Sequence, residues 1–288
     1  MRVLVFGASG QLGKKILETA PAWAELAAFS RVDVDVSSMS SLAEVFNKHQ
    51  PSIVINCAAY TAVDKAEVEA DLAYLINQEA VDFLAKLCLS HNAFLVHYST
   101  DYVFSGNQSS PYTETSPLSP MNVYGKSKAQ GELKIQQSGC FHAIIRTSWL
   151  YGEHGKNFLH TIATKLASGA MVKVVADQIG SPTYVGDLAA ATWELLADAK
   201  HLKMKEIFHY SNEGVASWYD FAFEIGILSQ KSSAVLPIRS DEYPTPARRP
   251  PYSVFDKSKI KTKLKSPIRH WKLALKESFI KYQEIHRI

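Results

Sequence analysis

Short apolar runs alternate with helix-like segments through the first half of the chain, and this alternation restricts the fold more than any other feature of the sequence. The apolar runs, which are typical of strands, occupy residues 2–6, 26–29, 52–57, 94–98 and 143–146. The helical patterns between them cover residues 11–20, 40–48, 70–90 and 124–137. Short strands that are separated by helices pair in parallel through right-handed crossovers. The sequence therefore predicts an α/β fold built on a doubly wound parallel sheet.

The second half of the chain is less regular and predicts a smaller C-terminal lobe. An apolar run at 172–175 and a helical pattern at 185–196 indicate a return to the first sheet. The proline-rich stretch 240–251 cannot continue a helix and predicts a loop. The predicted organisation is a core at 1–148 and a lobe at 149–288, with about 171–198 returning to the core sheet.

The composition is that of an ordinary globular protein and argues against several classes. Hydrophobic residues make up 47% of the 288 residues and charged residues 20%, which is enough for a sizeable buried core. No run approaches the ~18 apolar residues of a membrane helix, and the first apolar run is too short for a signal peptide. Cys57, Cys88 and Cys140 are odd in number and widely spaced, which disfavours a disulfide framework or a zinc site. We therefore expect a cytoplasmic protein with no membrane partner.

The positive charge of the chain is concentrated at its C-terminal end. Residues 245–288 contain 12 Lys and Arg against 3 Asp and Glu, whereas the net charge of the whole chain is +3. Such a segment suits nucleic acid, a membrane surface, a phosphate-bearing substrate or simply a solvated helix face. Because it contains no recognised nucleic-acid motif and no interleaved aromatic residues, we expect no nucleic-acid partner.

A glycine-rich turn follows the first apolar run directly and opens the first predicted helix. Gly7, Gly10 and Gly13 are spaced G-x-x-G-x-x-G, and Gln11 and Leu12 lie at the helix start. Glycines permit a tight turn and close backbone approach, while the N–H groups of a helix N-terminus attract a pyrophosphate. A glycine string alone is weak evidence, but its position between a strand and a helix is the context that this motif requires. The turn predicts a dinucleotide site.

The choice between the two nicotinamide dinucleotides depends on the end of the second predicted strand. Asp33 lies 20 residues after Gly13, where an acidic residue binds a free ribose 2′-hydroxyl and favours NAD. Ser30 and Arg31, however, lie at the strand tip itself, and a hydroxyl with a cation suits a 2′-phosphate. We favour NADPH, with NADH as the alternative.

Three further side chains form a predicted proton-transfer group. Tyr124 and Lys128 are four residues apart at the start of a predicted helix, so both project from one face. A free phenol has a pKa of ~10, and a nearby ammonium lowers that pKa. Thr100 ends a predicted strand, at the sheet edge where ligands bind, and its hydroxyl can hold a carbonyl oxygen beside the phenol. His97, inside the same strand, is interpreted as a core histidine.

These features, in this order, resemble the extended short-chain dehydrogenase/reductase superfamily, whose core is Rossmann-like. Longer strings narrow the resemblance to the dTDP-4-dehydrorhamnose reductase family. The strings that carry it are NCAAYTAVDKAE at 56–67, VHYSTDYVF at 96–104, NVYGKSK at 122–128, RTSW at 146–149, and YPTP with RP at 243–250. The resemblance extends over nearly the whole chain.

The resemblance implies NADPH-dependent reduction of the C4 ketone of dTDP-4-dehydro-L-rhamnose to dTDP-L-rhamnose, in nucleotide-sugar and surface-polysaccharide biosynthesis. It implies Tyr124 as the proton donor, Lys128 as the residue that lowers its pKa and binds the nicotinamide ribose, and Thr100 as the group that orients the ketone. The implied sugar-pocket residues are Val63, Thr100, Asp101, Tyr102 and Trp149. The implied cofactor residues are Gly7, Gly10, Gln11, Leu12, Gly13, Ser30, Arg31, Asp35, Val36, Ala58, Ala59, Tyr60, Tyr124 and Lys128. Arg249, beside Arg248 in the proline-rich loop, is a candidate for the nucleotide diphosphate because arginine suits bidentate phosphate contacts.

The chain departs from the family at the metal site that some members place at a dimer interface. The matching positions hold Lys15 and Gly186, neither of which can coordinate a hard cation. We therefore expect no Mg²⁺, and either a monomer or a homodimer.

Two rival functions remain open. One keeps the chemistry but changes the sugar to another nucleotide-linked 4-keto-6-deoxysugar. The other is a non-catalytic NADP-binding regulatory subunit that resembles the β subunit of methionine adenosyltransferase. The strings at 61–67 and 146–149 favour the reductase.

Overall fold

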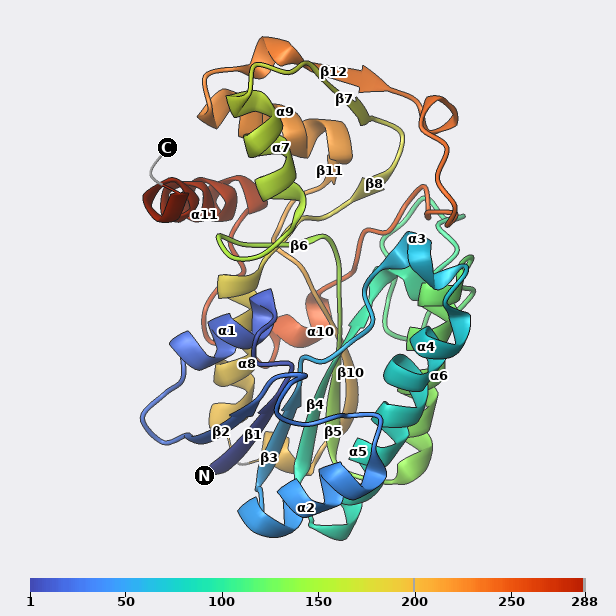
Figure 1. The fold of residues 1–288 in the computed structure, drawn as a ribbon, viewed down its shortest axis with the longest axis vertical. Coiled ribbons are helices and arrows are strands. Elements are labelled where there is room, and N and C mark those ends of the chain that lie inside the picture. The colour runs from blue at the N-terminus through green and yellow to red at the C-terminus, as the bar shows by residue number, and fades with distance from the viewer. Residues whose placement is uncertain (199, 287–288) are drawn as a thin grey trace.

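A six-stranded parallel sheet forms the lower part of the molecule (Figure 1) in a computed structural model that describes residues 1–198 and 200–286. Its strand order is β10-β5-β4-β3-β1-β2, and every neighbouring pair is parallel. The strands are β1 (Arg2–Phe6), β2 (Glu25–Phe29), β3 (Ile53–Asn56), β4 (Phe94–Thr100), β5 (His142–Thr147) and β10 (Lys205–Tyr210). The predicted α/β fold with a doubly wound parallel sheet is confirmed.

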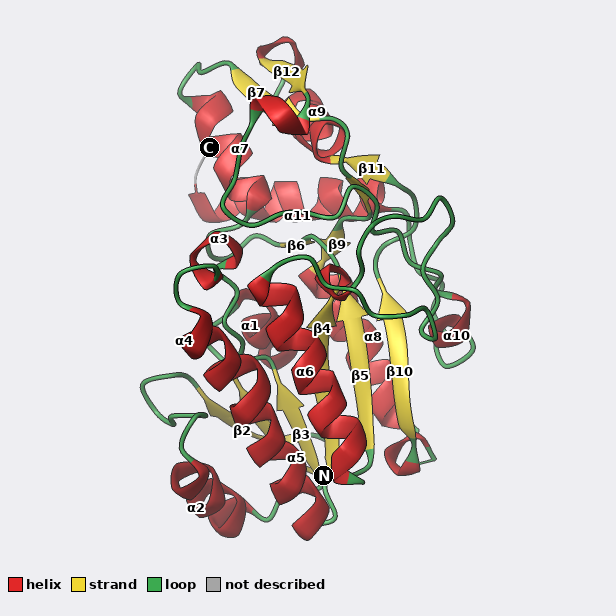
Figure 2. Ribbon diagram, turned by 90° about the vertical axis from the view of Figure 1, so that its right-hand side faces the viewer, coloured by secondary structure: helices red, strands yellow, loops and turns green. Residues whose placement is uncertain are grey.

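Helices cover both faces of this sheet (Figures 1 and 2). One face carries α1 (Gln11–Glu18) and α8 (Val185–Ala197), and the other carries α2 (Met39–His49), α5 (Ala80–Ser90) and α6 (Val123–Ser138). Side chains alternate between the two layers along each strand. In β1, Val3 and Val5 join the core beneath α1 and α8, whereas Leu4 and Phe6 join the core beneath α2 and α5. Burial on both faces explains why these strands are nearly uninterrupted apolar runs.

The helical pattern at 70–90 contains a local defect in the structure. An α-helical turn, α4 (Ala70–Tyr74), leads through a π-helical turn, η1 (Leu75–Glu79), into α5. π-turns inside α-helices are frequent at functional sites. Here the turn carries Asn77, a buried polar residue, on the side that faces α6.

The predicted return of 172–175 to the main sheet is wrong. This segment, β7 (Val172–Val175), pairs with β12 (Val235–Ile238) in a separate two-stranded sheet of the upper lobe. The free edge of β5 is taken by β10 instead, a strand that the sequence analysis missed. The chain does return to the core through α8, which packs against α1, and then through β10.

The remaining elements are short or belong to the upper lobe. They are α3 (Val63–Ala66), β6 (Leu150–Tyr151), α7 (Phe158–Ala167), β8 (Ile179–Gly180), β9 (Thr183–Tyr184), β11 (Ala216–Ser217), α9 (Trp218–Leu228), α10 (Ser258–Lys261) and α11 (Trp271–His286). Single 3₁₀ turns occur at Asp101–Val103, His201–Lys203, Ser232–Ala234 and Ser240–Glu242.

Besides Arg249, which pairs with Asp64, five positive side chains in the described part of residues 245–288 pair with acids from earlier in the chain. The pairs are Lys257 and Lys261 with Glu213, Lys259 with Glu206, Arg269 with Asp187, and Lys272 with Glu224. These side chains therefore attach the C-terminal segment to the body of the protein. Among the helices of the described residues, none is both long enough and apolar enough to cross a membrane.

Candidate active site

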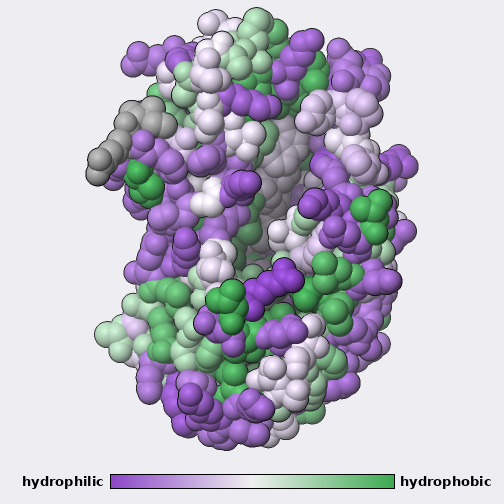
Figure 3. All heavy atoms as spheres, in the orientation of Figure 1, coloured by the Kyte–Doolittle hydropathy of each residue, from purple (hydrophilic) through white to green (hydrophobic). Residues whose placement is uncertain are grey.

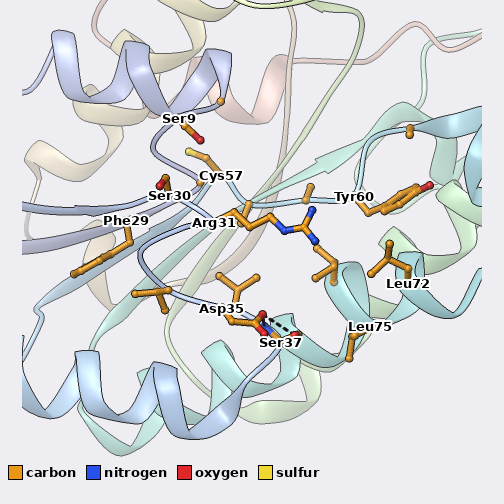
Figure 4. A pocket seen from close by; sticks show the side chains of 18 of the residues that line it. Ser9, Phe29, Ser30, Arg31, Asp35, Ser37, Cys57, Tyr60, Leu72 and Leu75 are labelled. Atoms are coloured by element: carbon orange, nitrogen blue, oxygen red, sulfur yellow. Dashed lines mark hydrogen bonds between the residues drawn. The ribbon is translucent and has the colours of Figure 1, made fainter. Parts of the chain in front are cut away.

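The carboxyl ends of β1, β2 and β3 border a cavity of about 630 Å³, and Figure 3 shows the surface hollowed between the sheet and the upper lobe. Ligands bind at this edge in open α/β sheets. Nine of the residues predicted to bind a cofactor line the cavity (Figure 4): Gly7, Gly10, Ser30, Arg31, Asp35, Val36, Ala58, Ala59 and Tyr60. The sequence analysis missed Ser9 and Lys65, which also line it.

The glycine turn fits closely against the end of β3. Gly7 has φ of +76°, and a Cβ there would lie 2.5 Å from the amide nitrogen of Ala58. A Cβ on Gly13 would lie 2.3 Å from the carbonyl oxygen of Gly7, so the first turn of α1 packs directly on the loop. Gly10 caps α1 without a side-chain hydrogen bond. The N–H groups of the first turn, which have no partner inside a helix, are therefore available to an anion.

Gln11 and Leu12 supply backbone and not side chains to this turn. The side chain of Leu12 is buried in the hydrophobic core beneath α1, and the amide of Gln11 lies 3.4 Å from Asn157 Nδ2.

At the tip of β2, the two candidate acids are held in different places. The Asp33 carboxylate accepts hydrogen bonds from the N–H (2.8 Å) and the hydroxyl (2.6 Å) of Ser30, and it does not line the cavity. The Asp35 carboxylate does line the cavity and is held by Ser37. Figure 4 shows the guanidinium of Arg31 extending across the cavity. A cation therefore faces the position that the sequence analysis assigned to a 2′-phosphate.

Tyr60 is fixed by Asn77, a residue that the sequence analysis missed. Asn77 Oδ1 accepts from the Tyr60 N–H at 2.9 Å, and Asn77 Nδ2 donates to the Tyr60 carbonyl and to Ser127 Oγ, both at 3.0 Å. This amide therefore joins the loop after β3 to α6. The sequence offered no local signal, because Asn77 is followed by the polar residues Gln78 and Glu79 in the same helical pattern.

Thr100 and Tyr124 meet where β4 ends and α6 begins. The Asn122 side chain caps α6 by accepting from the Gly125 N–H at 2.7 Å, which places Tyr124 in the first helical turn. Burial raises the pKa of the Tyr124 phenol to about 12, and the adjacent Thr100 hydroxyl partly offsets this rise. The phenol is thus protonated at neutral pH.

Lys128, which the resemblance implies lowers the pKa of Tyr124, forms its hydrogen bonds in this structure with residues of β4. Lys128 Nζ donates to the carbonyl oxygen of Tyr98 at 2.7 Å and lies 3.1 Å from Nε2 of His97. Burial lowers the pKa of Lys128 itself to about 8. His97 is fully buried and hydrogen-bonded, as its position inside a strand predicts.

A continuous row of side chains leads from Thr100 to the upper lobe. The hydroxyl of Ser253 lies beside the Asp101 carboxyl, whose pKa burial raises to about 6. A Cβ on Gly180 would lie 2.9 Å from Ser253 Oγ and 2.7 Å from the ring of Trp149. The predicted residues Asp101 and Trp149 therefore border the same space.

Two aromatic pairs flank this row. The Trp149 ring stacks on Trp218, with centroids 3.6 Å apart, and its backbone has φ of +48°, a left-handed conformation that is uncommon for a tryptophan. The Tyr102 ring packs edge-on against Tyr124, with centroids 5.8 Å apart. Trp218 was missed in the sequence analysis.

Val63 and Arg249 lie at the border between α3 and the proline-rich loop. The guanidinium of Arg249 forms two hydrogen bonds with the carboxylate of Asp64, at 2.9 and 3.1 Å. The side chain of Asn122 donates to the backbone carbonyl of Arg248 at 2.7 Å. The loop is therefore tied both to α3, which Val63 begins, and to the cap of α6.

Comparisons with known proteins agree with this geometry. The family described as RmlD substrate binding domain matches residues 1–284. The chain belongs to this family. It is 41% identical to a spore coat polysaccharide biosynthesis protein, SpsK, of Bacillus subtilis, with 96% of each chain covered. It is 39% identical to a probable dTDP-4,6-dihydroxy-2-methyloxan-3-one 4-ketoreductase of Streptomyces antibioticus, covering 97% of this chain and 95% of that one.

Among solved structures, the chain resembles a dTDP-4-dehydrorhamnose reductase from Bacillus anthracis in complex with NADP. The TM-score is 0.92 at 37% sequence identity, with 97% of this chain and 99% of that chain covered. The RmlD family fold therefore extends over the core and the upper lobe alike.

The burial of Asp101 makes a prediction for stability against pH. Its folded-state pKa of about 6 lies above its unfolded value of 3.8, so the charged form destabilises the fold and stability is lost as pH rises through the folded pKa. Relative to the Asp101→Asn variant, the unfolding free energy of the wild type should fall by about 1.4 kcal/mol between pH 5 and pH 8. Urea denaturation of both proteins at each pH measures this difference. A difference that does not change with pH would contradict the assignment.

Proposed function

We propose that the protein is an NADPH-dependent reductase that converts the C4 ketone of dTDP-4-dehydro-L-rhamnose to the alcohol, giving dTDP-L-rhamnose. Membership of the RmlD family and the NADP complex of the Bacillus anthracis relative support this proposal. The observation that carries it is the meeting of a protonated phenol, Tyr124, with the hydroxyl of Thr100 at the sheet edge that also holds the glycine turn. The glycine turn offers a site for a dinucleotide, and Tyr124 and Thr100 offer hydrogen bonds to a carbonyl oxygen.

The cavity fits a dinucleotide because the glycines of the turn carry no side chains at the positions where the backbone must approach the pyrophosphate. The N–H groups at the start of α1 would hold the pyrophosphate, Arg31 and Ser30 the 2′-phosphate, and Asp35 with Val36 the adenosine. Ala58, Ala59 and Tyr60 would lie along the ribose. When bound, NADPH supplies the hydride.

The chain's own residues supply the proton and hold the ketone. Tyr124, which keeps its proton at neutral pH, donates it to the C4 oxygen while Thr100 donates a second hydrogen bond to the same oxygen. Lys128 would contact the nicotinamide ribose, and its charge would then favour the phenolate that remains.

The sugar would lie between Tyr124 and the upper lobe. Asp101 can accept hydrogen bonds from sugar hydroxyls, and Trp149, held against Trp218, offers an apolar ring edge to a 6-deoxysugar. Tyr102 and Val63 would complete the pocket. Arg249 would reach the diphosphate by exchanging its present partner, Asp64, for a phosphate.

A second candidate substrate is another nucleotide-linked 4-keto-6-deoxysugar. It is favoured by the Streptomyces antibioticus relative, whose name specifies a different sugar ketone. The presence of Thr100, Tyr124 and Lys128 does not exclude the non-catalytic regulatory subunit, but the strings at 61–67 and 146–149 disfavour it.

We also propose that the protein acts in the cytoplasm as a monomer or homodimer, without nucleic acid and without Mg²⁺. Glu18, Glu153 and His154 bring potential ligand atoms within 4.8 Å of one another. Lys15 Nζ already lies 2.5 Å from both Glu18 and Glu153, so an ammonium supplies the positive charge there.

Turnover should depend on the phenol of Tyr124. We expect the wild type to oxidise NADPH in the presence of dTDP-4-dehydro-L-rhamnose, and Tyr124→Phe to lower kcat by roughly 10²–10⁴-fold while NADPH binding is kept. Absorbance at 340 nm and a binding titration measure the two effects. Faster turnover of another 4-keto sugar would favour the second candidate, and no turnover of any such sugar would favour the regulatory subunit.

Cofactor preference should depend on Arg31. Loss of a charge-assisted contact to the 2′-phosphate should weaken NADPH binding by about 10- to 100-fold in Arg31→Ala, with a much smaller effect on NADH. Fluorescence titrations with both nucleotides measure the two dissociation constants, and Arg239→Ala, at an exposed arginine of the upper lobe, is the control. Equal losses for the two nucleotides would instead point to Asp33 and NAD.

Metal removal should leave the reaction unchanged. Because Lys15 occupies the acidic cluster as an internal cation, dialysis against EDTA should alter kcat by less than twofold, and added Mg²⁺ should not increase it. Initial rates before and after dialysis check this. Activity that is lost to EDTA and restored by Mg²⁺ would refute it.

A further inference from the structure

The ring of His97 lies between two nitrogen groups inside the core beside the candidate active site. Its Nδ1 is 3.1 Å from Asn56 Nδ2, and its Nε2 is 3.1 Å from Lys128 Nζ. All three side chains are at least 97% buried. A buried polar group without a suitable partner is costly, so the protons in this row must be arranged to satisfy each contact.

The amide of Asn56 determines the tautomer of His97. Asn56 Oδ1 accepts a hydrogen bond from the N–H of Ala58 at 3.1 Å, which fixes its amide with the NH₂ group toward His97. A neutral imidazole has one donor and one acceptor nitrogen. Nδ1 must therefore accept from Asn56, and the ring proton must be on Nε2.

That tautomer in turn restricts Lys128. The Nε2–H of His97 points at Lys128 Nζ, and an ammonium has no lone pair with which to accept it. An uncharged amine can accept this hydrogen bond and still donate one N–H to the Tyr98 carbonyl at 2.7 Å. One further N–H then remains for a ligand.

We propose that His97 is a positioning residue that donates its Nε2–H to an uncharged Lys128 amine in the ligand-free protein, and that Lys128 becomes an ammonium when the dinucleotide binds. This inference rests on the proposed function for the identity of the ligand. At a pH above the free-state pKa of Lys128, which burial lowers to about 8, one proton passes from solvent to Nζ for each cofactor bound, and no bond between heavy atoms forms or breaks.

The surroundings of this pair permit an uncharged amine. The carboxylate of Glu132 on α6 would favour the ammonium form of Lys128. This carboxylate is already paired with Arg146 on β5, whose Nη2 lies 2.7 Å from Glu132 Oε2. Burial lowers the pKa of His142, also on β5, which favours its uncharged form. Burial lowers the pKa of Lys128 to about 8 and that of His97 well below its usual range.

The dinucleotide would reverse this balance. It brings anionic phosphates and ribose hydroxyl oxygens, which accept hydrogen bonds from Nζ, and nearby negative charge favours the ammonium. Binding that takes up a proton weakens as pH rises above the free-state pKa of Lys128, by at most tenfold per pH unit. The charge that stabilises the phenolate is then present in the loaded enzyme and absent from the empty one.

The tautomer of His97 can be measured without any ligand. Long-range ¹H–¹⁵N NMR of the full-length protein at pH 8.5 should show a His97 ring with a protonated Nε2 and an unprotonated Nδ1. The His97→Gln variant assigns the signal by its disappearance. A ring protonated on Nδ1 would overturn the proposal, because Nε2 would then be accepting from an ammonium.

The linked proton can be measured separately by NADPH titration between pH 7.5 and 9.5. The dissociation constant of the wild type should rise by close to tenfold per pH unit at the upper end, and this dependence should be lost in Lys128→Met. Lys126→Met, at an exposed lysine on the same helix, should keep it. A wild-type constant that is flat with pH, or a dependence that survives in Lys128→Met, would overturn the proposal. Failure to bind NADPH at any pH would refute the proposed function, while the NMR result would still report on His97.

Discussion

The central constraint on this molecule is that its six strands run parallel and that the four central ones, β1, β3, β4 and β5, are buried on both faces. The interiors of these four strands cannot expose a polar side chain to water, so their polar groups collect at the carboxyl ends or must find partners in the core. Gly7 follows β1, Ser30 follows β2, Ala58 follows β3, and Thr100 ends β4. One geometric rule therefore brings the glycine turn, the tip of β2 with Ser30 and Arg31, and the hydroxyl of Thr100 to one edge of the sheet from segments that are far apart in the sequence.

The same constraint explains the polar row inside the core. Asn56 and His97 are neighbours in the register between β3 and β4, and Lys128 reaches them from α6. In an exposed setting, each of these groups would exchange partners with water and carry its usual charge. In the core, the orientation of one amide fixes one ring proton, which in turn restricts one lysine. The positions of the protons beside the site thus depend on buried residues that do not line the cavity.

The sequence predicted the parts of the fold and site that depend on local pattern. The strands from 2 to 147, the glycine turn, and the Tyr124–Lys128 spacing follow from apolar periodicity and helix geometry, and they needed no knowledge of tertiary contacts. The parts that it missed depend on which segments meet. Nothing local indicates that β10 outcompetes 172–175 for the edge of β5, or that a π-turn directs Asn77 toward Tyr60. The sequence also contained no indication of the hydrogen-bond partners of Lys128, because they lie on another element, β4.

The ion pairs of the C-terminal segment attach it to elements that precede it in the second half of the chain. Lys257, Arg269 and Lys272 neutralise acids on β10, α8 and α9 and their flanking loops, and Trp271 is buried in the main hydrophobic core. A fragment that stopped before residue 245 would keep those carboxylates and lose their counter-charges, leaving an acidic body with an opened core. A C-terminal segment grafted onto another core would likewise lose the partners that Asp187 of α8 and Glu206 of β10 provide.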